Sequence, residues 1–220
     1  MTARATGPAP LRLVLASNNA RKLAEMRALL GGLALELVPQ GELGIPEAEE
    51  PHGTFVENAL AKARAAARAS GGAALADDSG LVVPALGGEP GVVSAEYAGP
   101  VPADGALDRE VRRRRQDEAN NARLLQRLHG VPDRRAAFVC TLVALRHAGD
   151  PLPLVATARW EGVVLEAPHG SGGFGYDPLL WIPALGATVA ELDPAQKNRH
   201  SHRAQAAAQM RELLRVQWDL

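Results

Sequence analysis

The stretch LRLVLASNNARKLAEMRALLGG, residues 11–32, joins a short apolar run to a segment with helical spacing. The run LRLVLA lacks the alternation of a half-exposed strand and is typical of a strand buried on both faces. After the polar SNNARK, Leu23, Met26 and Leu30 recur at intervals of three and four residues. This spacing predicts a helix, and the two glycines that follow predict its end. Strand, polar turn and helix together predict the first unit of an α/β fold.

Strands and helices are expected to alternate along the rest of the chain. Further strands are predicted by ALELVPQ, by the run that ends on Asp77-Asp78-Ser79-Gly80, by AAFVCTLVALRHAG and by residues 154–165. Helices are predicted from the capping-box pattern TFVE (residues 54–57) through Ser70, over residues 107–128, and from about Ser201 to Arg215. Residues 85–106 are rich in Gly and Pro and predict a loop. We therefore expect one α/β domain over residues 11–220, after a flexible tail of residues 1–10.

Composition and charge exclude several classes of protein. A net charge of −1 gives no general attraction to nucleic acid or to a membrane. No apolar stretch reaches the roughly 18 residues that a membrane span needs. The first ten residues lack the apolar core of a signal peptide, so we expect a cytoplasmic protein. A single cysteine, Cys140, excludes an internal disulfide, and its apolar neighbours predict a buried thiol.

Arginine clusters in RRRR, residues 112–115, which could attract nucleic acid. Acidic residues flank the cluster, and four consecutive helical residues spread around most of the helix circumference. We interpret it as a solvated helix surface.

The turn SNNARK lies where a phosphate could bind. Backbone N–H groups at a helix N-terminus attract anions, and Lys22 in the first turn could neutralise a phosphate. In the structural alternative, Ser17 or Asn18 caps the helix and nothing more. The chain contains no Walker A pattern, so a P-loop is excluded.

The sequence ADDSG sets two carboxylates side by side. Adjacent residues of a strand point to opposite faces, so we expect one of Asp77 and Asp78 to face a cleft and the other to be structural. The carboxylate that faces the cleft could hold Mg²⁺ or orient a water. In the alternative interpretation, Asp-Ser-Gly only forms a turn after the strand. The acidic loop with Glu47, Glu49 and Glu50 could donate a second metal ligand, although it could also be only solvated.

Two further motifs are unusual for a chain that is only 4% aromatic. GGFGYDPLLW, residues 172–181, places a Phe and a Tyr among glycines, which indicates that the loop grips something outside the core. KNRHSHR, residues 197–203, precedes the last predicted helix. His202 and Arg203, after a Ser201 cap, offer donors for a carbonyl oxygen or a phosphate. Exposed polar residues at a helix start are the alternative.

Taken in order, ASNNARK, TFVENALAKA, ADDSGL, LGGEPGVVSAEYAG, GGFGYDP and KNRHSHR resemble the inosine triphosphate pyrophosphatase family. The match runs from about Leu11 to the final helix. The resemblance implies hydrolysis of ITP, dITP and XTP to the monophosphate and pyrophosphate, which removes deaminated purines from the nucleotide pool. It also implies Mg²⁺ as cofactor and a homodimer, with no nucleic-acid polymer or membrane as partner. The implied fold is an elongated, two-lobed α/β domain around a long mixed β-sheet with flanking helices and an active cleft between the lobes.

The resemblance also implies roles for individual residues. Asp78 is expected to be the proton acceptor and a Mg²⁺ ligand, with Glu50 as the second metal ligand. The triphosphate is expected to contact Ser17, Asn18, Asn19, Ala20, Arg21 and Lys22. Substrate contacts are also expected from Lys62 and Ser79, with base and sugar held by Phe174, Gly175, Tyr176 and Asp177, and the base pocket completed by Lys197, His202 and Arg203. Two departures are Asn18, where many members have glycine, and the ten-residue N-terminal extension.

The chemistry of the residues agrees with this reaction. Release of pyrophosphate needs a metal ion that offsets the charge of the triphosphate, and a positioned water. The chain has only three lysines among its 24 basic residues, and all three fall in these motifs. An aromatic ring can stack on a purine, while donors such as those of His202 or Arg203 would favour a 6-carbonyl over an amino group. Guanosine shares this carbonyl, so its rejection must involve the 2-position of the base. The rival interpretations are a pyrophosphatase for modified pyrimidine nucleotides and a nucleotide-binding module without hydrolysis.

Overall fold

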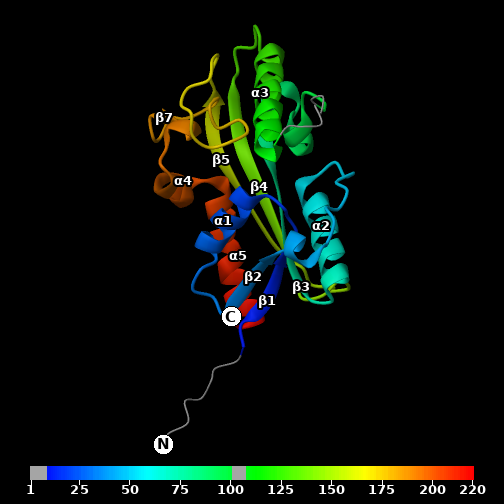
Figure 1. The fold of residues 1–220 in the computed structure, drawn as a ribbon. Coiled ribbons are helices and arrows are strands. Elements are labelled where there is room, and N and C mark those ends of the chain that lie inside the picture. Colours follow the sequence, from blue (N-terminus) through cyan, green and yellow to red (C-terminus); the bar gives the residue numbers. More distant parts are fainter. Residues whose placement is uncertain (1–8, 101–107) are drawn as a thin grey trace, which may run out of the picture. The chain divides into compact units, whose positions relative to one another are not determined.

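The structure is a computed structural model that describes residues 9–100 and 108–220. Within these residues a seven-stranded sheet has the order β2-β1-β3-β4-β5-β6-β7 (Figure 1). The strands are β1 (Leu11–Leu15), β2 (Leu35–Pro39), β3 (Ala73–Val82), β4 (Arg135–Leu145), β5 (Leu154–Val164), β6 (Leu180–Ile182) and β7 (Ala187–Thr188). The α-helices are α1 (Ala20–Leu29), α2 (Phe55–Ser70), α3 (Arg109–Arg127), α4 (Pro194–His200) and α5 (His202–Trp218). Short 3₁₀ segments cover Gln40–Leu43, Pro84–Leu86, Gly91–Glu96 and Val189–Glu191.

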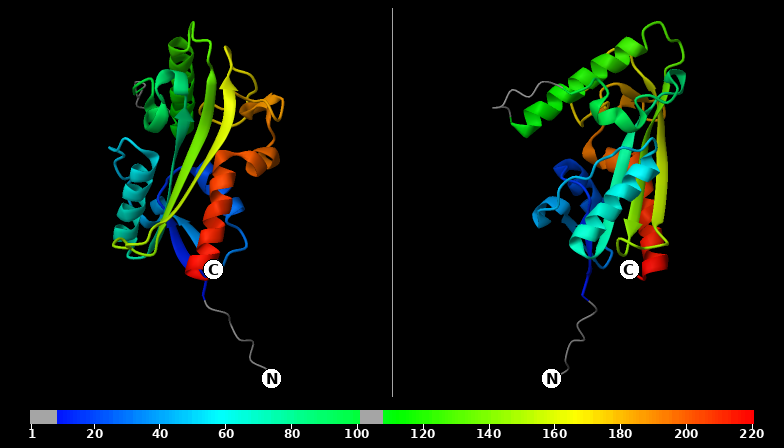
Figure 2. Two further views of the ribbon diagram at one scale, coloured as in Figure 1. Left: turned by 180° about the vertical axis from the view of Figure 1, so that it is seen from behind. Right: turned by 90° about the vertical axis from the view of Figure 1, so that its right-hand side faces the viewer.

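The sheet is mixed. β1 pairs in parallel with both β2 and β3, whereas β6 is antiparallel to β5 and to β7. β4 and β5 are neighbours in the sheet and the longest strands, with 11 residues each (Figure 2). β4 is buried along nearly its whole length, while alternate residues of β5 are exposed. This confirms the predicted mixed α/β fold with flanking helices.

The chain divides into two compact units. The first comprises the residues up to Asp78 together with residues 141–157 and 206–220, and the second comprises residues 79–140 and 158–205. β3, β4 and β5 contribute residues to both units. The predicted cleft between two lobes and the single domain over residues 11–220 stay predictions. Of the predicted tail, residues 1–8 lie outside the described residues.

One core cluster of the first unit is rich in small side chains. Val14 and Ala16 pack with Ala74 and Ala76 of β3 and with the alanine face of α2. That face is formed by Ala59, Ala63, Ala66 and Ala67, each at most 1% exposed. Because alanine adds little bulk, α2 lies close to the strands, and its neighbouring Lys62 is carried with it into the interior.

The core of the second unit is built from large side chains. Leu124 of α3, and Leu128 directly after this helix, pack with Phe138 of β4 and Trp160 of β5. Tyr176, which follows the glycines of the GGFGYD loop, belongs to the same cluster and is 4% exposed. The loop is therefore anchored in this core through a side chain of its own.

Most predicted elements are confirmed, but the sequence did not predict β6 and β7, and two other segments differ from the prediction. The strand β3 does not end at the DDSG motif but continues to Val82, because Leu81 and Val83 are fully buried. Part of KNRHSHR forms α4, a short helix that the sequence did not predict, which starts with a capping box between Asp193 and Gln196. Cys140 is buried, as predicted. Among the described residues, no helix is long and apolar enough to cross a membrane.

Candidate active site

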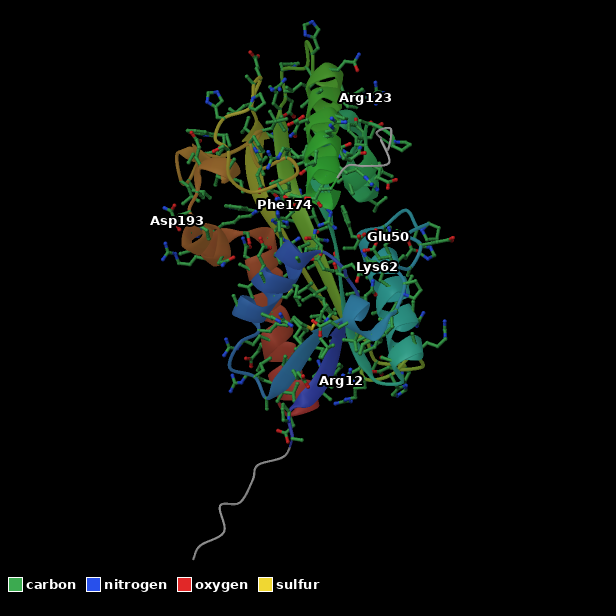
Figure 3. The ribbon with its side chains drawn as sticks, viewed as in Figure 1. Arg12, Glu50, Lys62, Arg123, Phe174 and Asp193 are labelled. Atoms are coloured by element: carbon green, nitrogen blue, oxygen red, sulfur yellow. The ribbon has the colours of Figure 1, made fainter. Side chains whose placement is uncertain are left out.

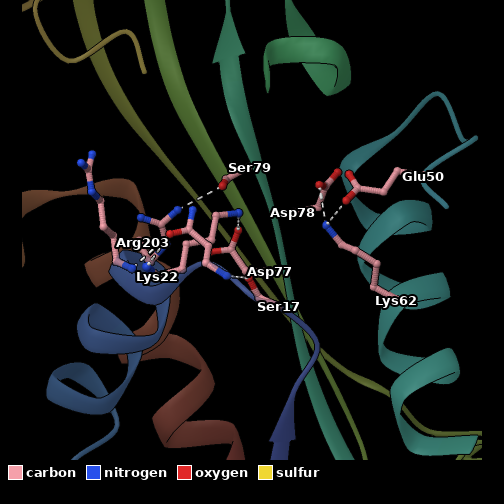
Figure 4. Close-up of polar contacts among 10 residues, drawn as sticks. Ser17, Lys22, Glu50, Lys62, Asp77, Asp78, Ser79 and Arg203 are labelled. Carbon is pink, nitrogen blue, oxygen red and sulfur yellow. Dashed lines mark hydrogen bonds and ion pairs between the residues drawn. The ribbon is translucent and has the colours of Figure 1, made fainter. Parts of the chain in front are cut away.

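Two neighbouring aspartates of β3 each form an ion pair with a different lysine. Asp77 accepts a hydrogen bond from Lys22 Nζ of α1 at 2.8 Å, and Asp78 accepts one from Lys62 Nζ of α2 at 2.9 Å. Successive strand residues point to opposite faces, and Figure 4 shows the two pairs on opposite sides of β3. Both carboxylates are buried. Each therefore has a compensating cation, which an ionised group in the interior requires.

Lys62 joins Asp78 to the acidic loop. Its Nζ also donates to Glu50 Oε1 at 3.1 Å. Figure 3 labels both residues, Lys62 on α2 and Glu50 in the loop before this helix. Burial favours the neutral amine, but the charges of Asp78 and Glu50 outweigh it and raise the pKa of Lys62. Lys62 is thus an ammonium between two carboxylates, and Glu50, with 44% of its side chain exposed, is open to solvent.

Asn58 explains how Glu50 reaches this place. Its side chain is fully buried, donates to the carbonyl of His52 at 3.2 Å and accepts from the N–H of His52 at 3.0 Å. One amide thus ties the acidic loop to α2, one turn before Lys62. Thr54 caps the same helix as predicted, because its Oγ1 accepts from the N–H of Glu57.

Asp78 is held in a state that suits a base or a metal ligand. Burial is the main reason that its pKa rises from 3.8 to about 6, against the opposing effect of Lys62. Its second oxygen, Oδ2, is buried and has no hydrogen-bond partner among the described residues. A buried acceptor without a partner is costly, so this oxygen is a candidate to bind a ligand.

The carboxylates of Asp78 and Glu50 fit a hard divalent cation. Oxygen ligands are what Mg²⁺ prefers, and it commonly takes one or two carboxylates from the protein. Within the described part of the chain, no group of three or more His, Cys, Asp or Glu side chains could hold a metal. An ion here would therefore complete its coordination with water and phosphate oxygens, as Mg²⁺ does in phosphoryl-transfer enzymes.

The turn before α1 is organised around Asn19. Its side-chain oxygen accepts from the N–H groups of Arg21 and Lys22, at 3.1 and 3.4 Å, and its own N–H donates to Ser17 Oγ. The cap is therefore Asn19 and neither Ser17 nor Asn18, because only Asn19 directly precedes the first helical residue, Ala20. Asn18 Oδ1 is buried without a hydrogen-bond partner among the described residues. Lys22 is positioned by Asp77 and keeps 19% of its side chain exposed.

In the second unit, the side chain of Asp177 binds both the GGFGYD loop and Lys197 by hydrogen bonds. One oxygen of Asp177 accepts from the N–H of Phe174 at 2.9 Å and from Lys197 Nζ at 2.7 Å. The ammonium of Lys197 also lies 4.5 Å from the centroid of the Phe174 ring, within cation–π range. Gly173 has φ +72°, and a Cβ there would lie 2.0 Å from the Asp177 carboxylate. The close approach therefore requires glycine at this position.

The two aromatic residues of this loop have different environments. Phe174 is half-buried. Tyr176 points into the core and donates its hydroxyl to the carbonyl of Ser94 at 2.9 Å, and burial raises its pKa above the usual value. The expectation that the Phe and the Tyr of this loop contact something outside the core is therefore wrong for Tyr176, because an aromatic side chain next to a core cluster is more stable inside it. Phe174 is the ring of this pair that remains for stacking.

The SHR motif is buried rather than exposed. Ser201 Oγ accepts from the N–H of Ala204 and caps α5 as predicted. His202 stacks on Phe138, with 5.0 Å between ring centroids and 23° between planes. Arg203 is 2% exposed and donates to Ser79 Oγ at 3.1 Å (Figure 4). The alternative of exposed polar residues at a helix start is thus excluded.

The structure gathers the predicted residues into four groups. These are Ser17 to Lys22 with Asp77; Glu50, Lys62 and Asp78; Phe174, Asp177 and Lys197; and Ser79 with Arg203, beside His202. Sequence reasoning missed Phe138, which orients His202, and Asp117 and Asn121 of α3, which bond to Gly175. The signal of Asp117 and Asn121 in the sequence is two polar residues four apart on a charged helix, which does not distinguish them from a solvated surface. Phe138 lies in an apolar run that predicts a core strand and nothing more.

Comparisons with known proteins agree with these motifs. The family model described as the Ham1 family matches residues 13–213. A protein named dITP/XTP pyrophosphatase from Leptothrix cholodnii is 66% identical, over 96% of this chain and 100% of the relative. Another of that name, from Methylibium petroleiphilum, is 63% identical, over 94% of this chain and 99% of the relative.

Solved structures are similar as well. The structure of a HAM1 protein from Coxiella burnetii has a TM-score of 0.81 at 43% identity and covers 93% of this chain and 98% of its own. A dITP/XTP pyrophosphatase from Mycobacterium abscessus has a TM-score of 0.68 at 38% identity, over 91% and 98%.

Proposed function

The chain belongs to the Ham1 family, and we propose that it acts as its relatives are named, as a dITP/XTP pyrophosphatase. It hydrolyses the triphosphates of deaminated purines, ITP, dITP and XTP, to the nucleoside monophosphate and pyrophosphate. The observation that carries the catalytic part of this proposal is Asp78. It is a buried carboxylate with a raised pKa, held by Lys62 through one oxygen and without a hydrogen-bond partner among the described residues at the other.

In the proposed reaction, one water molecule is consumed for each triphosphate. Its oxygen forms a bond to phosphorus, the bridging P–O bond between the α and β phosphates breaks, and pyrophosphate leaves. Asp78 accepts the proton of the water. A carboxylate with a pKa of about 6 is mostly ionised at pH 7 and is a better base than an ordinary aspartate. Lys62 keeps Asp78 oriented toward the reacting atoms.

We propose Mg²⁺ as the cofactor, held by Asp78 and Glu50. When bound, the ion would offset the charge of the triphosphate and position its oxygens. Lys22, together with the backbone of residues 17–21, would bind phosphate oxygens at the start of α1. The Lys22–Asp77 pair holds the lysine at this helix start without consuming all its donors, because an ammonium has three.

The second unit supplies the groups for the purine base. Phe174 would stack on the base with the ring face away from Lys197, and stacking contributes roughly 1–3 kcal/mol. His202 and Arg203 are nitrogen donors that would meet the 6-carbonyl of inosine or xanthosine. Adenosine has an amino group at that place, which would leave such donors unpaired. The backbone of Tyr176 would complete the contact with base and sugar.

Asp78→Asn tests the catalytic assignment. We expect pyrophosphate release from dITP to fall at least about a hundredfold, because general base catalysis contributes roughly 10²–10⁴-fold. Binding of dITP, measured by calorimetry, should persist. The matched control is Glu49→Gln, which removes one negative charge from the exposed acidic loop and should leave the rate within about twofold. A fully active Asp78→Asn enzyme would refute the role of Asp78.

Substrate and metal are tested together in the parent protein. Release of pyrophosphate from dITP and XTP should require Mg²⁺ and stop with a chelator, whereas GTP and ATP should react poorly. Equal rates for dITP and ATP would contradict the proposed base selection. Activity on modified pyrimidine triphosphates in place of dITP would favour the rival pyrophosphatase.

Two further properties are proposed from the family resemblance. We propose a homodimer, which sedimentation velocity at several protein concentrations would distinguish from a monomer. We also propose that the enzyme works in the cytoplasm, where the nucleotide pool lies. Fractionation of cells followed by immunodetection of the chain would test this location.

A further inference from the structure

Gly175 is held at both of its backbone polar groups by one helix. Its N–H donates to Asp117 Oδ2 at 2.9 Å, and its carbonyl accepts from Asn121 Nδ2 at 3.0 Å. Asp117 and Asn121 lie four residues apart on α3 and therefore on the same helix face. These contacts join parts of the chain that are 58 and 54 residues apart in sequence.

The backbone of Gly175 decides where its neighbours point. It has φ +61°, in the left-handed region, so the chain reverses sharply between Phe174 and Tyr176. Phe174 is tied by its N–H to Asp177, and Tyr176 by its hydroxyl to Ser94. The contacts from α3 hold Gly175, which lies between these two anchored residues. Three consecutive residues of the loop are thus fixed by four different partner residues.

The helix is itself fixed independently of Asp117 and Asn121. Asn120 is 2% exposed, donates to the carbonyls of Ser94 and Ala95 at 3.2 and 2.9 Å, and accepts from the N–H of Ala98 at 2.9 Å. Leu124 is fully buried in the core of the second unit. Loss of Asp117 should therefore leave α3 in place and release the loop.

We propose that Asp117 and Asn121 are positioning residues for purine binding. They hold residues 174–176 in the conformation that presents Phe174 to the base, and they act through the loop without touching substrate. This inference rests on the proposed function, because it takes the loop to be the base-binding element. The hydrogen bond to Asp117 is charge-assisted, so we assign it the larger effect.

The test separates the base-binding end of the substrate from the phosphate end. The two products serve as probes: dIMP carries the base, and pyrophosphate does not. Inhibition of dITP hydrolysis by each is measured at saturating Mg²⁺ in the parent, Asp117→Ala, Asp117→Asn, Asn121→Ala and Glu118→Ala. Glu118 is the exposed neighbour on the same helix, so its variant removes the same charge without touching the loop.

For Asp117→Ala we expect the KM for dITP and the inhibition constant of dIMP to rise about tenfold, the effect of one charge-assisted hydrogen bond. The kcat and the inhibition constant of pyrophosphate should stay within about twofold. Asp117→Asn should be closer to the parent, because an amide oxygen can still accept from Gly175. Asn121→Ala should show the same pattern, with a smaller rise, and it decides the matter if Asp117→Ala does not fold.

Two results would overturn the inference. One is weaker inhibition by dIMP and pyrophosphate to the same degree, which would indicate a general structural effect. The other is an Asp117→Ala or Asn121→Ala enzyme that behaves like Glu118→Ala. A parent protein that releases no pyrophosphate from dITP would instead refute the proposed function.

Discussion

At the scale of single residues, Asp78 is under two opposing influences. Burial raises its pKa, and the ammonium of Lys62 lowers it, with burial the stronger of the two. Glu50 adds a further negative charge near the same lysine. The folded protein therefore carries an ionised carboxylate at neutral pH in a place that favours its neutral form. Such an unfavourable charge is typical of functional sites, where a bound cation or a transferred proton relieves it.

This conflict predicts a pH-dependent stability. Because the pKa of Asp78 is higher in the folded protein than in the unfolded chain, its stabilising contribution is full below about pH 4 and is lost as the pH rises through about 6. The Asp78→Asn variant does not lose stability in this way, because an asparagine side chain does not titrate. In the presence of a chelator, its free energy of unfolding relative to the parent should rise by at most about 3 kcal/mol between pH 4 and pH 7. Urea denaturation at intervals of one pH unit measures it, and a difference that does not change with pH would contradict the prediction.

At the scale of elements, α2 does two tasks with different residues. Its alanine face packs against the strands, and its polar residues hold the acidic loop and Asp78. Lys62 lies one turn after Asn58 on this helix. Asn58, which binds the backbone of His52, and Lys62 therefore lie on the same side of the helix. The ammonium of Lys62 can then bind the carboxylates of both Glu50 and Asp78.

Loss of the tie should weaken metal binding. Asn58→Ala leaves the N–H and the carbonyl of His52 without their partner and should cost about 1–3 kcal/mol of unfolding free energy. Because Glu50 is then less well held, the Mg²⁺ concentration for half-maximal activity should increase. Titration of activity with Mg²⁺ measures this.

Thr54→Ala is the matched control for that experiment. It removes the cap of the same helix, at a cost of about 1 kcal/mol, without breaking the tie to His52. Its Mg²⁺ requirement should equal that of the parent. If both variants shift the Mg²⁺ requirement equally, then the effect follows from the stability of α2, and the tie has no special role.

At the scale of the whole molecule, each unit has its own core. The first includes a cluster rich in alanine, and the second includes a cluster of large aromatic and aliphatic side chains. The base-side loop continues directly into the large core, since Tyr176 and Leu179 belong to it. The stability of the second core should therefore influence how well the loop is held.

A substitution in the second core tests this dependence. Leu179 is fully buried, so Leu179→Ala should lower the free energy of unfolding by about 2–5 kcal/mol. Leu152 is 66% exposed, and Leu152→Ala should change it by less than about 0.5 kcal/mol. We also expect the KM for dITP to rise in Leu179→Ala alone. Urea denaturation and initial rates, measured on the same preparations, give both results, and an unchanged stability in Leu179→Ala would contradict the assigned core.

The sequence by itself determined most of the elements and the family. The strand, turn and helix at residues 11–29, the alanine-rich α2 and the later long strands follow from local periodicity, which neighbouring residues decide. The six motifs, read in order, were enough to name the family. Glycines at Gly173 and Gly175 also marked the loop where the backbone needs unusual conformations.

Only the tertiary structure decided which side chains meet. Asp77 pairs with Lys22, 55 residues away in sequence, and Asp78 pairs with Lys62, 16 residues away. Both pairings depend on how β3 lies beside two helices. That Tyr176 points inward depends on the carbonyl of Ser94, 82 residues away. The contacts of Asp117 and Asn121 with Gly175 likewise depend on where α3 lies. Such contacts have no local pattern, because their free energy comes from packing and burial, which exist only once the chain is folded.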